Sequence, residues 1–335
     1  MGYTIDPEHK EILDKMFEEG KLIMSIDETE NAADLEPIWG NWLFKHTIVE
    51  EVGATGLSKT TFNYLLASSL INHKPFLGIN GNHALEQIRV LYLDLESSES
   101  LIKSRRAMLD LPNSPHFLFC NLPSVTVYEL ETYIKAYVEQ TGPIHIIFID
   151  PLRMAFNTHD ENDNSEASKQ MKFLRHLTEE LDCSIVLVHH SSKAELGGTK
   201  KGSGAYARTS LADIVWNFEK LGEGYSSDLF KFYIPKNRYI DDGLCLCIKK
   251  EEMSFKLVDF PSNYAHDGNT TKVYSLQQEI GNLFLDGERH DTQELQKKYP
   301  GMNRMMLYRV LGALMQLGKI KKVKQGVYVM LQRKM

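Results

Sequence analysis

Cysteine is scarce in this chain, with 4 cysteines among 335 residues, and long apolar runs are missing. No apolar stretch reaches the roughly 18 residues that a membrane span needs, and the charged N-terminus lacks the apolar segment of a secretory signal. The cysteines do not have the spacing of a zinc site. Cys245 and Cys247 lie in an apolar, strand-like run, where buried reduced thiols are expected. We therefore expect a cytoplasmic protein with no membrane partner.

Negative charge is missing from the C-terminal end. The segment Leu295–Met335 holds ten Lys or Arg residues and no Asp or Glu, whereas the whole chain has a formal net charge of −7, so the remainder carries −17. A basic segment on an acidic protein is typical of a nucleic-acid-binding surface. A solvated basic face is the alternative that charge alone leaves open.

Apolar periodicity predicts a helix over 6–21, a polar loop over 26–36, and then strands alternating with helices. Strands are expected at 47–51, 89–95, 116–120, 144–149, 184–189, 228–234 and 244–248, and helices at 60–71, 98–108, 127–140 and 165–181. The near-continuous apolar run 144–149 is typical of a central parallel strand buried on both faces. This alternation predicts an α/β fold with a mostly parallel sheet and helices on both faces.

The last 75 residues predict a second, smaller domain. A polar, turn-rich stretch over 261–275 is the expected linker. Helices are expected at 275–284, 292–298 and 303–317, followed by two strands around Gln325-Gly326, and this pattern predicts a winged helix. The expected organisation is thus an N-terminal helix and acidic loop (1–35), a core (36–260), the linker (261–275) and a basic winged helix (276–335).

A glycine-rich loop between the first core strand and its helix has the composition of a phosphate-binding loop. Such a loop wraps an anion with backbone N–H groups, then adds a helix N-terminus, a lysine for the phosphates and a hydroxyl for Mg²⁺. The residues are Gly53, Ala54, Thr55, Gly56, Leu57, Ser58, Lys59 and Thr60, with Thr61 next on the helix. Ser58 stands where a glycine normally precedes the lysine, which reduces backbone freedom, so weakened nucleotide affinity is expected. An accidental Gly/Ser turn is the alternative.

Two further strands end in acidic residues. The run Ile146–Ile149 ends in Asp150, which would face the Mg²⁺ side of a phosphate site at the carboxyl edge of the sheet. The run from Leu91 ends in Asp94 and Glu96, and Glu96 is suited to polarise a water for attack on the γ-phosphate. A glutamate that merely caps a helix is the alternative for Glu96. Together with the loop, these elements predict an ATP and Mg²⁺ site.

Over about residues 35–255 the chain resembles the RecA/DnaB superfamily of P-loop ATPases, and most closely its RepA-like branch of plasmid and phage hexameric helicases. Beyond the elements above, the resemblance depends on four short motifs. They are Asp150-Pro151-Leu152-Arg153, His189-His190-Ser191-Ser192-Lys193, Lys200-Lys201-Gly202-Ser203-Gly204 and Lys236-Asn237-Arg238. The resemblance implies a RecA-like core, a homo-oligomeric ring that is expected to be a hexamer, and single-stranded DNA in its channel.

The resemblance also implies roles for individual residues. Lys59 and Thr60 would hold phosphates and Mg²⁺, Asp150 would hold Mg²⁺ through water, and Glu96 would hold the attacking water. His190 would report the γ-phosphate state to the DNA loops; a buried, hydrogen-bonded histidine is the alternative. Arg238, with Lys236, would act in trans on the neighbouring subunit's γ-phosphate; an ordinary exposed strand end is the alternative.

Nucleic-acid contacts are expected in two places. The resemblance places the loops 157–168 and 194–205 at the ring channel; the first is acidic, so Lys200 and Lys201 of the second would grip single-stranded DNA. In the winged helix, duplex DNA would meet the recognition helix and the wing, although docking to another protein remains open. The candidate contacts there are Arg304, Arg309, Lys321, Lys322 and Lys324.

Three functions are compatible with the sequence. The first is an ATP-dependent DNA helicase or translocase of a plasmid, phage or mobile element. The second is an ATP-switched DNA-binding regulator or loader without unwinding activity, which Ser58, the acidic channel loop and the winged helix would suit. The third is a nucleotide-dependent signalling scaffold without nucleic acid, and the basic C-terminal segment argues against it.

Overall fold

The computed structural model describes residues 7–18, 35–81, 87–121, 125–156, 163–190, 203–221, 226–239, 245–261, 279–281, 283–284, 287–300, 302, 304–316 and 319–330. The chain divides into two compact units, Met1–Glu36 and Pro37–Met335. In the first unit, helix α1 (Pro7–Glu18) falls within the range expected from its apolar periodicity. Its side chains Leu13, Met16 and Phe17 are exposed.

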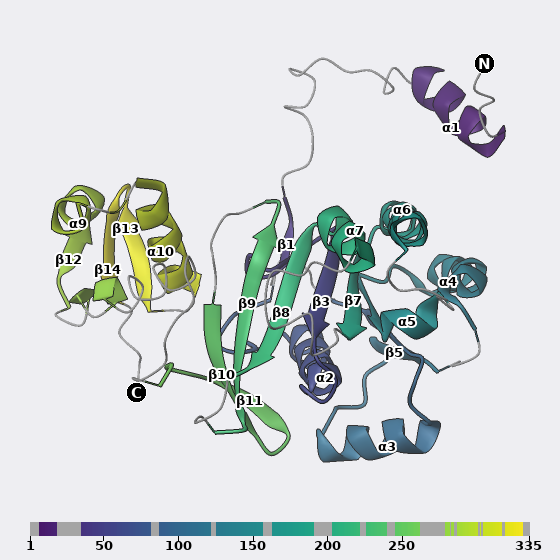
Figure 1. Ribbon diagram of the computed structural model, residues 1–335, viewed down its shortest axis with the longest axis horizontal. Helices are drawn as coiled ribbons and strands as arrows, with labels where there is room; N and C mark the ends of the chain where they lie inside the picture. Colours follow the sequence, from purple (N-terminus) through teal and green to yellow (C-terminus); the bar gives the residue numbers. More distant parts are fainter. Residues whose placement is uncertain are drawn as a thin grey trace. The chain divides into compact units, whose positions relative to one another are not determined.

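A mixed nine-stranded sheet forms the centre of the second unit (Figure 1). Its order is β11-β10-β9-β8-β3-β7-β6-β4-β5, in which β8 through β5 are parallel and the pairs β8–β9, β9–β10 and β10–β11 are antiparallel. The strands are β3 (Ile48–Gly53), β4 (Val90–Asp94), β5 (Phe117–Cys120), β6 (Ile146–Asp150), β7 (Ser184–His190), β8 (Ile214–Lys220), β9 (Leu229–Asn237), β10 (Cys245–Glu251) and β11 (Ser254–Val258).

Helices cover both faces of this sheet because the parallel strands are apolar on both sides (Figure 1). One core joins the sheet to α2 (Lys59–Ile71) and to the short hairpin of β1 (Pro37–Trp39) and β2 (Leu43–Phe44). The other core joins it to α4 (Val127–Thr141), α5 (Leu152–Ala155) and α6 (Asn164–Glu180). Helix α7 (Ser203–Leu211) contacts α6, whereas α3 (Glu99–Met108) has no buried residue.

The expected α/β class is therefore confirmed, with a mostly parallel sheet covered on both faces. Strands β8 and β11 and the hairpin β1–β2 were not expected from the sequence. β8 interrupts its apolar run with Asn217 and Glu219, and its pairing with β3 joins segments far apart in the chain. Such a strand is specified by tertiary partners more than by its local pattern.

Among the described residues, the C-terminal part contains the helices α9 (Thr292–Lys298) and α10 (Arg304–Gln316) and a small antiparallel sheet, which share an apolar core. Residues 279–281 and 283, within the helix expected over 275–284, are also helical, and Ile280 and Phe284 belong to the same core. The helices α9 and α10 and the strands β13 (Ile320–Lys324) and β14 (Val327–Met330) agree with the expected ranges. A third strand, β12 (Arg289–Asp291), was not expected; it pairs with β14. Residues 262–275 of the expected linker lie outside the described residues. Within the described ranges, no helix combines the length and the apolar character that a membrane crossing requires.

Candidate nucleotide-binding site

The glycine-rich loop lies between β3 and α2, at the carboxyl edge of the parallel strands. This is the edge at which open α/β sheets bind ligands. Gly56 has a φ of 82° and Ser58 a φ of 62°, so two of its residues are left-handed. Gly53 has no room for a side chain, because a Cβ there would lie 2.9 Å from the carbonyl oxygen of Phe218. The chain therefore turns tightly into the N-terminus of α2, as an anion-binding loop requires.

Lys59 is buried at the first position of α2 and is held by three acceptors. Its Nζ donates to the carbonyl oxygens of Gly53 at 2.6 Å and Ala54 at 3.0 Å, and lies 3.0 Å from Nδ1 of His190. Burial lowers the pKa of Lys59 below its usual value, while the nearby acids Glu51 and Asp150 act in the opposite direction. The ammonium group is therefore desolvated before a ligand arrives, which makes its interaction with a phosphate stronger than in water.

Thr60 and Asp150 place a hydroxyl and a carboxylate side by side, and oxygen donors of this kind are those that Mg²⁺ prefers. The Thr60 hydroxyl donates to Oδ2 of Asp150 at 2.7 Å, and the Tyr92 hydroxyl donates to the same oxygen at 2.8 Å. Burial raises the pKa of Asp150 above its usual value, and these two hydrogen bonds oppose the rise. Asp150 and Thr60 would hold Mg²⁺ beside the phosphates, where the ion supplies charge neutralisation when bound.

A cavity of ≈ 470 Å³ lies in front of the loop and gathers the residues expected from three strand ends. It is lined by loop residues from Thr55 to Thr61, including Lys59 and Thr60, and by Glu96, Asp150 and His190. Glu96 is exposed to this space. The structure thus brings together the loop, the proposed Mg²⁺ ligands, the proposed water-activating acid and the strand-end histidine.

Asp94 and Arg105 also line the cavity, and neither was assigned a role from the sequence. Oδ2 of Asp94 accepts from the Tyr64 hydroxyl at 2.9 Å and from Nη1 of Arg105 at 3.3 Å, and the same guanidinium donates to Oγ of Ser97 at 2.5 Å. The buried Asp94 therefore ties α3 to the end of β4 and fixes the turn that carries Glu96. In the sequence, the position of Asp94 at the end of an apolar strand, two residues before Glu96, could have indicated this role.

Glu51 is a second acid that sequence reasoning missed. It is fully buried on β3, where Nδ2 of Asn63 lies 2.5 Å from its Oε2. Among the described residues, none makes a hydrogen bond to its Oε1. Burial raises the pKa of Glu51 to about 8, and the charge of Lys59 acts against that rise. Two adjacent glutamates, Glu50 and Glu51, interrupt the apolar run of this strand, and the sequence alone does not show that both are buried. Burial makes such an acid costly unless it is neutral or paired.

The contact between His190 and Lys59 predicts a dependence of stability on pH. Burial, with Lys59 and His189 nearby, lowers the pKa of His190 to about 4, from an ordinary value of 6.5. Because the unfolded chain takes up this proton first, the stability contributed by neutral His190 is complete above about pH 6.5 and is lost as the pH falls towards 4. We expect His190→Asn to flatten the fall in unfolding free energy across this range, as measured by urea denaturation.

One full proton changes the unfolding free energy by ~1.4 kcal/mol per pH unit. The change in slope caused by His190→Asn should be smaller than this, because solvent screens the half-buried ring. His176→Asn is the matched control, since His176 lies on the exposed side of α6 and is half-exposed. Equal slopes for the wild type and His190→Asn would show that the ring titrates normally.

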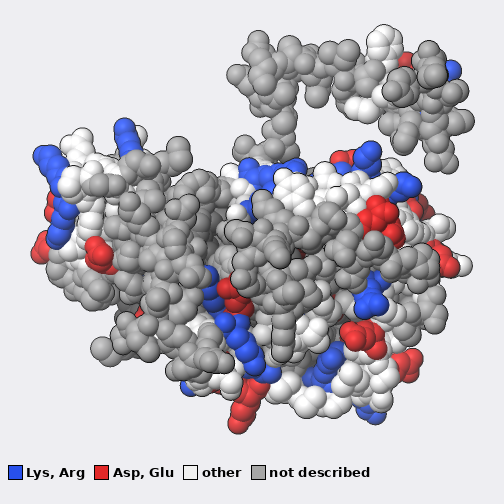
Figure 2. Space-filling model, viewed as in Figure 1, with Lys and Arg blue, Asp and Glu red and all other residues white. Residues whose placement is uncertain are grey.

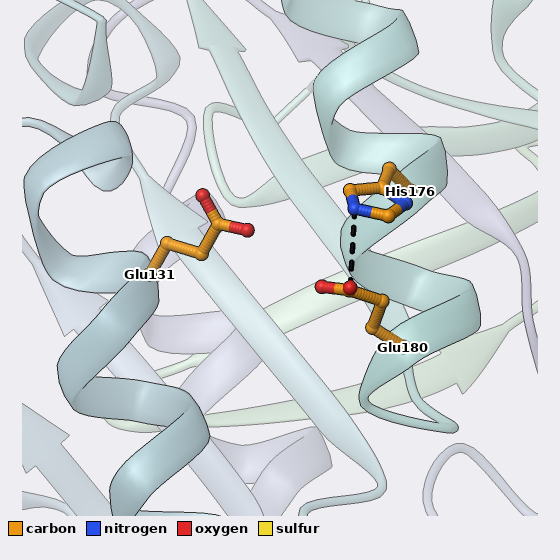
Figure 3. A group of neighbouring side chains, drawn as sticks. All are labelled: Glu131, His176 and Glu180. Atoms are coloured by element: carbon orange, nitrogen blue, oxygen red, sulfur yellow. Dashed lines mark ion pairs between the residues drawn. The ribbon is translucent and has the colours of Figure 1, made fainter. Parts of the chain in front are cut away.

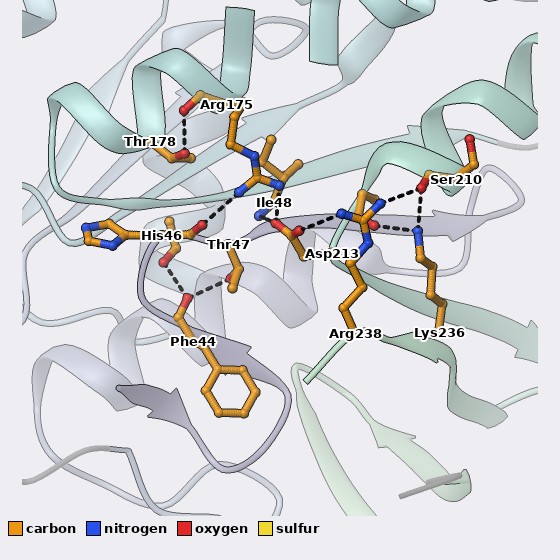
Figure 4. A network of polar contacts seen from close by, with 12 residues as sticks. Phe44, His46, Thr47, Ile48, Arg175, Thr178, Ser210, Asp213, Lys236 and Arg238 are labelled. Carbon is orange, nitrogen blue, oxygen red and sulfur yellow. Dashed lines mark hydrogen bonds and ion pairs between the residues drawn. The ribbon is translucent and has the colours of Figure 1, made fainter. Parts of the chain in front are cut away.

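Arg238 and Lys236 lie at the amino ends of the parallel strands, whereas the loop lies at their carboxyl ends. The end of β9 pairs with the start of β8, and Figure 4 shows both side chains directed towards the end of α7. Lys236 Nζ donates to the carbonyl oxygens of Thr209, Ser210 and Ala212 at 2.6–2.7 Å. Arg238 donates to Ser210 O at 2.8 Å and lies 3.5 Å from Oδ1 of Asp213. The structure therefore does not bring them to the cavity of their own chain.

The proposed nucleic-acid contacts are only partly described. Lys200 and Lys201 lie outside the described residues, as do 157–162 and 194–202 of the two loops, and the side chain of Arg309 is likewise undescribed. Arg304 is exposed on α10, 5.7 Å from the ring of Tyr308. Lys321, Lys322 and Lys324 are exposed on β13. Lys and Arg side chains project from the C-terminal part at the left of Figure 2.

A separate group of possible metal ligands lies on α4 and α6. Within the described ranges, only one group brings three such ligand atoms close together, and it consists of Glu131, His176 and Glu180 (Figure 3). The Lys135 ammonium already pairs with both glutamates, at 2.6 Å from Oε1 of Glu131. Since a cation of this chain neutralises the two acids, we assign no metal to them.

Comparison with known proteins agrees with this geometry. A family model described as an AAA domain (AAA_25) matches residues 21–195. The chain belongs to this family. The solved structure titled "ATPase Domain of G40P" is similar in fold, with a TM-score of 0.52 at 14% sequence identity, over 76% of this chain and 100% of that one. No curated protein matches the chain. Family and fold together support a P-loop ATPase with a RecA-like core.

Proposed function

We propose that this ATPase is an ATP-dependent DNA helicase or translocase of a plasmid, phage or mobile element, acting as a homo-oligomeric, hexameric ring. The observation that carries the proposal is the separation of two half-sites on one chain. Lys59, Thr60, Asp150 and Glu96 line one cavity, whereas Arg238 lies at the other edge of the sheet. An arginine that cannot reach its own site is suited to complete a neighbour's, which makes hydrolysis depend on assembly.

The basic surfaces support DNA as the partner. Exposed lysines along β13 suit contact with phosphates more than base reading. Lys200 and Lys201 would hold single-stranded DNA in the channel, and the C-terminal part would bind duplex DNA as a winged helix. His190 would relay the γ-phosphate state through its contact with Lys59. The cellular setting of such an enzyme would be DNA replication in the cytoplasm of its host.

Strand displacement on a forked DNA substrate tests the proposal. We expect the wild type to displace the strand only with ATP and Mg²⁺, and its mass in solution to become that of a ring when ATP and single-stranded DNA are added. Glu96→Gln is the matched control, because it should bind ATP and assemble while hydrolysing about 10²–10⁴-fold more slowly. Hydrolysis without strand displacement or movement along DNA would contradict the helicase function.

A regulator or loader that uses ATP as an assembly switch is the second candidate. It is favoured by the many internal contacts of Lys236 and Arg238, which hold both side chains against α7 and Asp213 in this state. For this candidate, ATP should change the affinity for duplex DNA without strand displacement. Fluorescence anisotropy with labelled duplex, with and without a non-hydrolysable ATP analogue, distinguishes the two functions.

A further inference from the structure

Ser58 occupies a backbone position in the phosphate loop that favours glycine. Its φ of 62° and ψ of 26° are left-handed, a conformation in which a Cβ costs about 1–2 kcal/mol. Ser58 is also the N-cap residue of α2, yet its side chain makes no capping hydrogen bond. Something other than the helix therefore determines where its hydroxyl points.

That partner is Lys250, 192 residues further along the chain. Lys250 Nζ donates to Oγ of Ser58 at 2.8 Å. Aromatic packing places the lysine there: its cross-strand partner is Phe255 of β11, and the Phe255 ring meets Phe62 of α2 at a centroid distance of 5.6 Å. Cross-strand partners share one face of a sheet. The hairpin β10–β11 is thus held against the first turns of α2, and Lys250 reaches the loop.

We propose that Lys250 is a positioning residue of the nucleotide site. The hydroxyl of an N-cap serine ordinarily accepts hydrogen bonds from the first N–H groups of its helix, and these are the groups that bind a phosphate. By donating to Oγ, Lys250 turns the hydroxyl away from them and stabilises the left-handed residue. It also adds a positive charge beside the site of a nucleoside triphosphate. Lys250 thus offsets the loss of affinity expected from serine at this position.

Titration of a fluorescent ATP analogue into four variants tests this role. We expect Lys250→Met to weaken binding about tenfold, the effect of one charge-assisted hydrogen bond. The melting temperature of the nucleotide-free protein should fall by only a few degrees, because the same bond also stabilises left-handed Ser58. Lys249→Met is the matched control and should stay within about twofold, because that side chain is directed away and pairs with Glu251 and Asp228. The other two variants are Ser58→Gly alone and Ser58→Gly combined with Lys250→Met. In the Ser58→Gly background, Lys250→Met should have almost no further effect, because the hydroxyl it positions is absent.

The role of Lys250 rests on the proposed nucleotide site and does not require movement on DNA. The possible outcomes therefore distinguish a wrong role for Lys250 from a wrong nucleotide site. Wild-type affinity in Lys250→Met would overturn the role. An equal loss with Ser58 present and in the Ser58→Gly background would overturn it too, since the lysine would then act by charge alone. If Lys59→Ala binds the analogue as tightly as the wild type, the nucleotide site itself is wrong, and the role of Lys250 falls with it.

Discussion

Lys59→Ala is expected to weaken ATP binding on the order of 100-fold and to abolish hydrolysis. The ammonium group is buried, its pKa is lowered by that burial, and it points between Gly53, Ala54 and His190 at the front of the cavity. A charged hydrogen bond in such a place contributes about 1.5–3 kcal/mol, and a triphosphate accepts more than one. Isothermal titration calorimetry with ATP and Mg²⁺ measures the loss directly.

The control for this prediction is the stability of the nucleotide-free protein. Lys59 is held by neutral acceptors and burial disfavours its charge, so its removal should leave the fold intact. The melting temperature without nucleotide should therefore change little, while the rise in melting temperature that ATP gives the wild type should disappear. A variant that still gains stability from ATP would place the nucleotide at another site.

The parts of this site that could be predicted from sequence are those whose functional residues are neighbours in the chain or directly follow a recognisable strand. The loop and its helix are consecutive, and Asp150 ends a run of apolar residues, so the carboxyl edge of a parallel sheet had to bring them together. Lys59 and Thr60 follow the glycines directly. For these residues the local pattern fixes both the element and the side of the sheet, and the cavity contains them as expected.

The parts that escaped prediction depend on register and on distant pairing. Nothing near Ser58 in the sequence indicates Lys250, because their contact requires the antiparallel strands β9 to β11 to pack on α2. The same holds for Asp213, which pairs with Arg175 of α6 and with Arg238, just beyond β9. Neutral Glu51 depends on complete burial, which a sequence of two adjacent glutamates does not suggest. Side-chain partners across the sheet are set by tertiary structure.

Arg238→Ala is expected to lower kcat by a factor of about 10³–10⁵ if the arginine acts in trans. The same change also breaks an ion pair with buried Asp213, so loss of activity alone would be ambiguous. Arg175→Ala supplies the matched control. Its Nη2 lies 2.5 Å from Oδ2 of Asp213, so that variant damages the same ion-pair network from the other side (Figure 4). Both variants should lower the melting temperature, but only Arg238→Ala should lose hydrolysis at a temperature where both are folded.

Mixing subunits then separates action in trans from action in cis. A Glu96→Gln subunit retains Arg238, and an Arg238→Ala subunit retains Glu96, so a junction between them can contain one complete site. We expect the mixture to regain part of the hydrolysis that each variant lacks. A mixture of Glu96→Gln with Lys59→Ala should regain none, because both residues line the cavity of one chain and neither neighbour can restore it. Equal rates in the two mixtures would show that Arg238 holds Asp213 and α7 in place without entering a neighbour's site.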